Sequence, residues 1–249
     1  MRGGGGIERS DCYRFLDSLE DGSIDALITD PPYGTMNVAW DQSVDWDRWW
    51  RIVERKLKPS GVVICFAAGK FVFELQASKA DWYRYDLVWH KSRPVGFLNA
   101  NHRPLIAHEM ILVFAPRWKA STYVAQRIGC AVKAQHKRRA AERRSTLYGG
   151  HGKGFAWVDN GTRHPTSVLS FASVSNSERF HVTQKPLDLV RWLVRSFTNR
   201  GDLVCDPFMG SCTTGVACAE ESRRFTGCER EPAIYRRAIK RLRSIRVIQ

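Results

Sequence analysis

The chain has 249 residues, 43% of them apolar, with nine tryptophans and a formal net charge of +14. This length is sufficient for one large α/β domain, or one domain with an insertion, and for a substantial core. No apolar run reaches about 18 residues, which excludes a transmembrane helix, and the positive charge favours a polyanionic partner such as nucleic acid.

The seven cysteines are odd in number and form no Cys-x-x-Cys pair. This pattern argues against a disulfide framework and against a familiar zinc site. The histidines have no diagnostic spacing, so we expect no metal. The amino-terminal glycine run lacks the apolar core of a signal peptide. The sequence therefore favours a protein of the reducing cytoplasm, without a membrane partner.

Predicted strands and helices alternate along most of the chain. Apolar runs predict strands at 7–11, from Ile24, at 62–66, 85–89, 110–114, from Leu203 and at 224–228. Helical periodicity predicts helices at 13–19, 46–57, 71–78, 187–197, 213–219 and 234–245. This alternation indicates an α/β fold with a doubly wound, largely parallel sheet that is covered on both faces.

The strand that begins at Ile24 stops at Asp30-Pro31-Pro32-Tyr33-Gly34. The prolines hold the chain extended and lack N–H groups, so the backbone here presents carbonyl oxygens. The carboxylate of Asp30 and the carbonyl of Pro31 could accept the two N–H bonds of a planar amine. Tyr33 supplies an aromatic face on which the ring of that amine could stack. We expect this stretch to be an acceptor site for a planar amine.

The segment 116–180 interrupts the alternation and is the predicted insert. Between Pro116 and Pro165 there are eleven Lys or Arg and two acids, a local balance of +9. A solvated basic helix over 133–144 is the alternative to a binding surface. The candidate nucleic-acid contacts are Lys133, Lys137, Arg138, Arg139, Arg143, Arg144 and Lys153.

A second unusual stretch, Asp206 to Gly215, follows the Leu203 strand and begins Asp-Pro-Phe-Met-Gly-Ser. A strand, a glycine-bearing turn and a helix N-terminus together form a site for a nucleoside-containing cofactor. Glu229 ends the next strand, twenty-three residues after Asp206, where an acid accepts hydrogen bonds from ribose hydroxyls. The turn lacks the Gly-Lys-Ser/Thr of a phosphate loop, so a cofactor with one ribose and a carboxylate fits better.

These stretches together resemble the amino-directed, S-adenosylmethionine-dependent DNA methyltransferases. Asp30 to Tyr33 resembles their catalytic tetrapeptide, 206–211 their cofactor loop, and 183–187 the segment that precedes this loop. Because the catalytic motif comes first, the order resembles the β class. The resemblance implies a Rossmann-like methyltransferase sheet with permuted motif order. It also implies a catalytic half at 1–115, a target-recognition insert at 116–180 and a cofactor-binding half at 181–249.

The resemblance implies roles for single residues. The catalytic residues would be Asp30, Pro31, Pro32 and Tyr33. Asp11 would hold the cofactor adenine and Glu229 its ribose, and the other cofactor contacts would be Asp30, Lys185, Asp206, Phe208, Gly210, Ser211 and Thr213. Two positions depart from the family pattern, since Ser10 and Cys212 stand where glycine is usual.

The function implied is methylation of adenine N6 in DNA, since aspartate first and tyrosine fourth in the tetrapeptide go mostly with adenine. Cytosine N4 methylation remains the alternative. A catalytically silent nucleic-acid-binding protein of the same fold and an RNA methyltransferase also stay open. Besides DNA, the candidate partners are a second copy of the chain, as a homodimer, and a restriction endonuclease of the same system.

Overall fold

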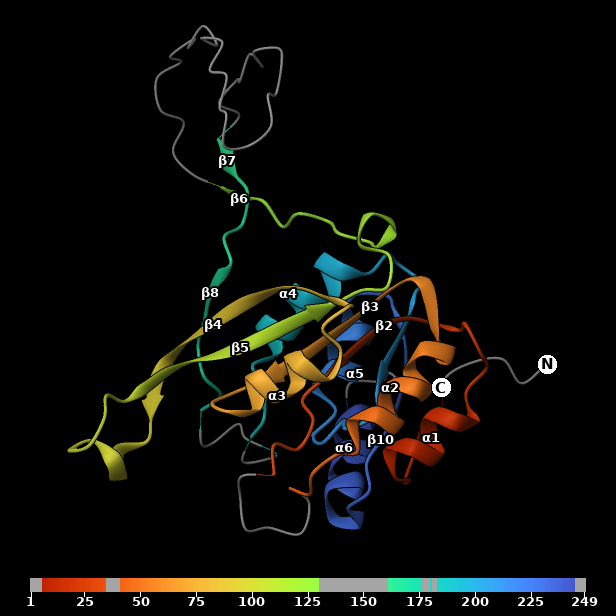
Figure 1. The fold of residues 1–249 in the computed structure, drawn as a ribbon, viewed down its shortest axis with the longest axis horizontal. Helices are drawn as coiled ribbons and strands as arrows, with labels where there is room; N and C mark the ends of the chain where they lie inside the picture. The colour runs from red at the N-terminus through yellow and green to blue at the C-terminus, as the bar shows by residue number, and fades with distance from the viewer. Residues whose placement is uncertain (1–5, 35–40, 130–160, 176–179, 181–182, 245–249) are drawn as a thin grey trace, which may run out of the picture. The chain divides into compact units, whose positions relative to one another are not determined.

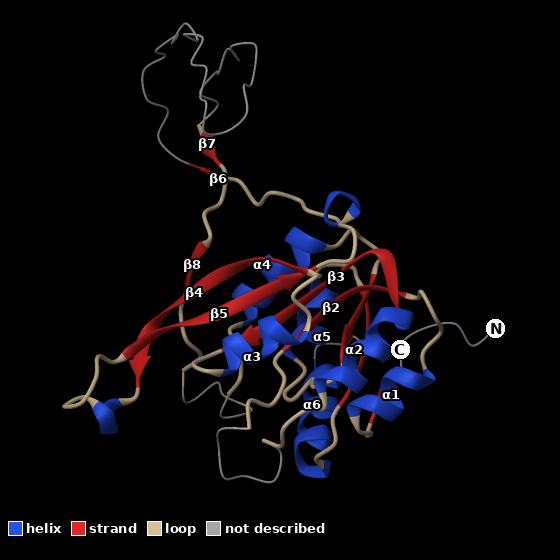
Figure 2. Cartoon of the chain, viewed as in Figure 1, coloured by secondary structure: helices blue, strands red, loops and turns tan. Residues whose placement is uncertain are grey.

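The computed structural model describes residues 6–34, 41–129, 161–175, 180 and 183–244. The chain divides into two compact units, one of residues 1–124 with 167–249 and the other of residues 125–166. The first unit contains an eight-stranded sheet with helices on both faces (Figures 1 and 2). Within the described ranges, no helix is long and apolar enough to cross a membrane.

The helices and strands follow the predicted order, with changed bounds. The strands of the large sheet are β1 (Ile7–Glu8), β2 (Ile24–Thr29), β3 (Leu57–Ala67), β4 (Tyr83–Val95), β5 (Ile106–Phe114), β8 (Val168–Phe171), β9 (Leu203–Asp206) and β10 (Arg224–Cys228). The helices are α1 (Cys12–Ser18), α2 (Trp46–Lys56), α3 (Phe71–Ser78), α4 (Leu187–Phe197), α5 (Thr213–Glu220) and α6 (Pro232–Ser244), with short 3-10 turns at Phe97–Asn99 and Trp118–Ala120. In the second unit, β6 (Ile128–Gly129) pairs antiparallel with β7 (Thr162–Arg163).

The order of the large sheet is β1-β10-β9-β2-β3-β5-β4-β8. The five strands from β1 to β3 are parallel to one another, as predicted for most of the sheet. β5 is antiparallel to both of its neighbours, β3 and β4. The connection between β4 and β5 spans only 96–105, which is too short for a parallel crossover, so the two strands form a hairpin. The paired strands therefore extend beyond the predicted strands 85–89 and 110–114, to Val95 in β4 and back to Ile106 in β5.

Side chains that alternate along the strands form two separate cores. Leu27, Val63 and Leu112 face α1, α2 and α3, whereas Ile28 and Ile64 face α4 and α5 on the opposite side of the sheet. Strands buried on both faces read as continuous apolar runs, which explains why these segments were recognisable in the sequence. A smaller core joins α6 to α5 and to the loop that follows β9.

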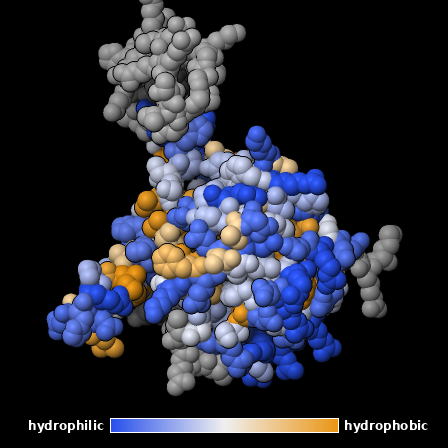
Figure 3. Space-filling model, in the orientation of Figure 1, coloured by the Kyte–Doolittle hydropathy of each residue, from blue (hydrophilic) through white to orange (hydrophobic). Residues whose placement is uncertain are grey.

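The range 116–180, predicted to be the insert, contains the whole of the second compact unit. It also contains β8, which is hydrogen-bonded to β4 at the edge of the large sheet. The β4–β5 hairpin projects from the first unit (Figure 1), and its end carries exposed apolar side chains among hydrophilic ones (Figure 3). The large apolar side chains exposed there are Val95, Phe97, Leu98 and Leu105.

Candidate functional site

The candidate site lies at the carboxyl ends of β2 and β9, which are adjacent and parallel with Leu27 paired to Cys205. From this pair the sheet continues through β3 in one direction and through β10 in the other. Such a point, where the strand order reverses, is where doubly wound sheets bind ligands. Because the two strands end side by side, Asp30 and Asp206 lie at the same edge of the sheet.

A cavity of about 660 Å³ opens at this edge. Its volume is in the range of small-molecule and cofactor sites. The structure brings together around it every residue predicted to be catalytic or cofactor-binding, namely Asp11, Asp30, Pro31, Pro32, Tyr33, Lys185, Asp206, Phe208, Gly210, Ser211, Thr213 and Glu229. These residues come from five separate stretches of the chain, and the fold places them on one surface.

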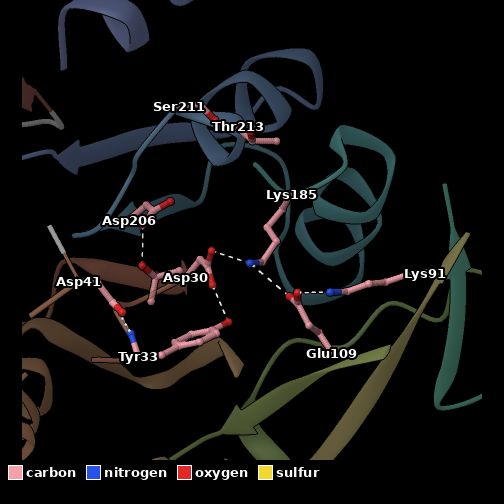
Figure 4. A network of polar contacts seen from close by, with 10 residues as sticks. Asp30, Tyr33, Asp41, Lys91, Glu109, Lys185, Asp206, Ser211 and Thr213 are labelled. Carbon is pink, nitrogen blue, oxygen red and sulfur yellow. Dashed lines mark hydrogen bonds and ion pairs between the residues drawn. The ribbon is translucent and has the colours of Figure 1, made fainter. Parts of the chain in front are cut away.

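The loop after β2 is fixed by Asp41 and Tyr33 (Figure 4). Asp41 Oδ1 accepts hydrogen bonds from the backbone N–H groups of Tyr33, at 2.7 Å, and Gly34, at 2.9 Å. The Tyr33 hydroxyl donates to Asp30 Oδ1 at 2.8 Å, and its ring stacks on Phe71 with 4.7 Å between centroids. Burial, with the nearby charge of Asp30, raises the pKa of Tyr33 well above its usual value, so the phenol stays a donor.

Asp30 is the first member of a chain of charged side chains. Lys185 Nζ lies 2.5 Å from Asp30 Oδ2 and 3.3 Å from Glu109 Oε2 (Figure 4). Glu109 Oε1 in turn lies 2.5 Å from Lys91 Nζ. Burial raises the pKa of Asp30, and the Lys185 ammonium opposes this shift. Burial also disfavours the charge of Lys185, but Asp30 and Glu109 outweigh it and raise the Lys185 pKa, so the ammonium is maintained.

Asp206 has a different environment. The residue is 3% exposed, and its Oδ1 accepts the Thr29 hydroxyl at 2.6 Å and the backbone N–H of Phe208 at 3.2 Å. Burial raises the pKa of Asp206 to about 7, although the hydrogen bond from Thr29 acts in the opposite direction. The donors to Asp206 are a neutral hydroxyl and a neutral amide, whereas Asp30 is paired with the Lys185 ammonium. The two carboxyls at the strand ends therefore differ in the charge of their partners.

The loop after β9 is held by Glu229, which follows β10, and by Arg241 of α6. The Gly210 N–H donates to Glu229 Oε2 at 3.1 Å, and the Glu231 N–H donates to the other oxygen at 2.8 Å. On the other side of the loop, the Arg241 guanidinium of α6 donates to the Ser211 carbonyl at 2.9 Å and to Thr213 Oγ1 at 3.0 Å. The turn is therefore preorganised before any ligand contacts it.

Cys212 and Asp11 each shape a helix start beside the cavity. Cys212 has φ +59°, the left-handed region that favours glycine, and it precedes the first residue of α5. Asp11 Oδ1 caps α1 by accepting the N–H groups of Tyr13 and Arg14 at 3.1 and 3.0 Å. Asp11 thus has a structural role in addition to its place on the cavity wall.

Five residues that support the site were not predicted from the sequence: Thr29, Asp41, Lys91, Glu109 and Arg241. No local motif marks them. Thr29, Lys91, Glu109 and Arg241 act through partners on other elements, and Asp41 acts within an irregular loop. One signal was present for Glu109, a carboxylate that directly precedes the apolar run 110–114 of a strand. A charged residue next to a buried strand is rarely buried unless it is paired.

The candidate nucleic-acid contacts of the insert lie outside the described residues. These are Lys133, Lys137, Arg138, Arg139, Arg143, Arg144 and Lys153.

The cavity suits a nucleoside that carries an amino-acid tail. Glu229 offers a carboxylate at the end of β10, the strand next to β9, as required for ribose hydroxyls. Asp30, Glu109 and Asp206 place acidic groups along the wall, together with the aromatic rings of Tyr33 and Phe208. Six acidic and four basic residues line the cavity in all, so the wall accepts a cationic centre more readily than an anionic phosphate.

Comparisons with known proteins agree with this arrangement. A family described as DNA methylase, of the N6 and N4 type, matches residues 24–240. The type II methyltransferase M1.MboII of Moraxella bovis is 27% identical over 242 residues, which cover 90% of each chain. M.HpaI of Haemophilus parainfluenzae is 26% identical over 251 residues, covering 94% of this chain and 73% of that protein.

Solved structures share the fold. A complex of M1.HpyAVI with S-adenosylmethionine superposes with a TM-score of 0.63 at 24% identity, covering 95% of this chain and 98% of that one. The PvuII DNA methyltransferase, described as cytosine-N4-specific, gives a TM-score of 0.64 at 19% identity, covering 96% and 86%. The doubly wound, Rossmann-like architecture expected from the sequence is confirmed.

Proposed function

This chain belongs to the DNA methylase family of S-adenosylmethionine-dependent amino-methyltransferases, which act on adenine N6 or cytosine N4, and we propose that its target is adenine N6. Transfer of a methyl group to an amine is supported above all by the shared cavity. The Asp30–Tyr33 stretch and the carboxylate of Glu229 line the same space, so an amine acceptor and a nucleoside site face one another.

The residues of the second half of the cavity would hold the cofactor. Glu229 would accept the ribose hydroxyls and Asp11 would contact the adenine. The methionine end would lie among the loop residues, namely Lys185, Asp206, Phe208, Gly210, Ser211 and Thr213. When bound, S-adenosylmethionine supplies a methyl group on a positively charged sulfur, an electrophile that needs no further activation.

Asp30 and Pro31 would activate the acceptor amine. The lone pair of an exocyclic amine is delocalised into the ring, and acceptance of both N–H bonds by the Asp30 carboxylate and the Pro31 carbonyl favours a pyramidal nitrogen. Both oxygens of Asp30 already have partners, in Tyr33 and Lys185. A carboxylate has about four lone-pair positions, so Asp30 can accept the amine as well.

The step then balances within the site. The amine lone pair would form the new N–C bond as the C–S bond breaks. The C–S electron pair would stay on sulfur as a neutral thioether, and the nitrogen would take the positive charge. Asp30 stabilises this charge and accepts one N–H proton, which then passes to solvent. Asp30 need not be a strong base beforehand, because the amine becomes acidic only as the bond forms. Most of the rate gain comes from positioning and electrostatic stabilisation.

To reach Asp30, the target base has to leave the stack of the duplex, which costs a few kcal/mol. The ring of Tyr33 can offset part of this cost by stacking on the base. Phe71 packs against Tyr33 at 4.7 Å between centroids and supports the ring in place. Tyr33 thus provides a rigid aromatic face beside the carboxylate.

The choice of adenine rests on Asp30 and Tyr33 at the first and fourth positions of the tetrapeptide, and on the greater stacking area of a purine. Cytosine N4 is the second candidate, which the cytosine-N4-specific PvuII neighbour favours.

The deciding experiment is incubation of the protein with methyl-labelled S-adenosylmethionine and DNA, followed by mass analysis of the nucleosides. We expect N6-methyladenine. N4-methylcytosine alone would reject the adenine assignment, and no methylated nucleoside would favour a silent binding protein. Greater labelling of RNA than of DNA would identify an RNA enzyme.

The insert is the proposed DNA-reading segment, because a local balance of +9 attracts phosphates. Neutralising Lys137, Arg138, Arg139, Arg143 and Arg144 together should weaken binding to all DNA sequences. The log–log salt slope should fall by about 0.9 for each phosphate that the variant no longer neutralises. An unchanged slope would identify the run as a solvated face.

The type II relatives also support a restriction endonuclease as partner, and a homodimer is the proposed assembly.

A further inference from the structure

Two charged residues in the cavity wall have no role in the steps above. Lys91 is on β4 and Glu109 is on β5, and both line the cavity that contains Asp30. Their side chains are only 9% and 14% exposed, and that of Lys185 is 10% exposed. Charged side chains this deeply buried normally need compensating partners.

Glu109 is the carboxylate that connects the two ammonium groups (Figure 4). Its Oε1 lies 2.5 Å from Lys91 Nζ, and its Oε2 lies 3.3 Å from Lys185 Nζ. Among the described residues, Oε2 is a buried atom without a hydrogen-bond donor, and the Lys185 ammonium compensates it through charge at 3.3 Å. Burial disfavours the ionised carboxyl, but Lys185 and Lys91 outweigh this effect and lower the Glu109 pKa.

The charges of this cluster cancel. Asp30 and Glu109 contribute two negative charges, and Lys91 and Lys185 contribute two positive charges. Without Glu109 the cluster would carry one excess positive charge at low exposure to water. That charge would lie on the wall of the cavity in which Asp30 would meet a cationic methyl donor. Charge interactions across a poorly solvated cavity are much stronger than they are in water.

We infer that Glu109 is a positioning residue that keeps Lys185 beside Asp30 and sets the charge of the cavity wall, so that a positively charged methyl donor is accepted. The inference rests on the proposed function, because that function supplies the cationic ligand. Glu109 acts through Lys185 and through its field, and it does not contact the reacting atoms. If Glu109 had only a structural role, its replacement would lower stability but would weaken the binding of charged and uncharged ligands equally.

The test compares two ligands that differ in charge. S-adenosylmethionine has a positively charged sulfur, whereas S-adenosylhomocysteine lacks the methyl group and this charge. In Glu109→Gln, calorimetric titration should show affinity for S-adenosylmethionine falling about tenfold more than affinity for S-adenosylhomocysteine. This is the order expected for unit charges several ångströms apart at a protein site. The double variant Lys91→Met with Glu109→Gln restores a neutral cluster and should return the ratio of the two affinities to within about threefold of wild type.

Asp25→Asn is a matched control. The Asp25 side chain is 15% exposed and pairs with Lys58 at 2.6 Å, but it does not line the cavity. Its loss should leave the affinity ratio unchanged. The inference is overturned if Glu109→Gln weakens the binding of both ligands equally. It is also overturned if the double variant is folded, as shown by thermal melts, but does not restore the ratio of the two affinities. If the wild type binds neither ligand, the proposed function fails instead.

Discussion

Asp30 and Asp206 occupy equivalent places in the sequence, since each ends a run of apolar strand residues and each is followed by proline. The two strands, β2 and β9, are neighbours in the sheet. Asp30 has Lys185 and the Tyr33 hydroxyl as partners and a side chain that is 24% exposed. Asp206 has Thr29 and a backbone N–H as partners and is 3% exposed.

The difference shows that a strand-end carboxyl takes its chemistry from tertiary partners. Burial raises the pKa of both carboxyls, but at Asp30 the Lys185 ammonium opposes this shift and favours the ionised form, which can accept an amine. Asp206 has hydroxyl and amide donors, and burial raises its pKa to about 7. Asp30 is thus suited to act on the acceptor base, and Asp206 to hold the turn around the cofactor. Four predictions test this division, in order of decreasing effect.

Asp30→Ala should lower the rate of methyl transfer by at least about a hundredfold, because the amine loses its charged acceptor. Affinity for uncharged S-adenosylhomocysteine should change by less than about threefold, since Glu109 remains beside Lys185. Affinity for S-adenosylmethionine should fall by about tenfold, because the cluster gains the same excess positive charge as in Glu109→Gln. Single-turnover methylation and calorimetry would measure the two quantities. A loss of cofactor affinity as large as the loss of rate would place Asp30 in the cofactor site.

Asp206 should make stability depend on pH. Its folded-state pKa of about 7 is above the ordinary value, so the protonated form is favoured in the folded protein. This contribution is fully present below about pH 4 and is lost as the pH rises to about 7. Relative to Asp206→Asn, the wild type should lose up to about 4 kcal/mol of unfolding free energy over this range. Urea unfolding at a series of pH values would measure the difference, and parallel curves would contradict a raised pKa.

Glu229→Ala should weaken cofactor binding by roughly tenfold to a hundredfold, because the variant removes hydrogen bonds to a charged group. The transfer rate at saturating cofactor should change much less. Glu231→Ala is the matched control, since the backbone N–H that Glu231 donates to Glu229 is retained. Calorimetric titration would decide, and equal affinities for wild type and Glu229→Ala would remove Glu229 from the ribose site.

Cys212→Gly should have the smallest effect. Glycine relieves a left-handed conformation that costs other residues about 1–2 kcal/mol. The Cys212 side chain is fully buried against Met209 and Val216, so its loss has an opposing cost of similar size. The unfolding free energy should therefore change by less than about 1 kcal/mol, as measured by urea titration. A stabilisation above about 2 kcal/mol would mean that strain alone matters at this position.

Features set by local sequence were predictable, and features set by distant partners were not. The apolar runs of β2 and β9, the proline-terminated turns and the periodicity of α4 all depend on neighbouring residues. The direction of β5 was not predicted, because it depends on pairing across a hairpin. The contacts among the charged side chains were not predicted either, because they join residues far apart in the sequence. Lys185 and Asp30 are 155 residues apart, and Glu109 has no motif of its own.

The most direct test of separate roles for the two aspartates measures cofactor affinity and single-turnover rate together in Asp30→Ala and Asp206→Ala. We expect a crossed pattern. Asp30→Ala should lose rate more than affinity, and Asp206→Ala should lose affinity more than rate when compared at saturating cofactor. If both variants lost the two quantities in the same proportion, the two strand-end aspartates would not have separate roles, and the proposed division between acceptor site and cofactor site would be wrong.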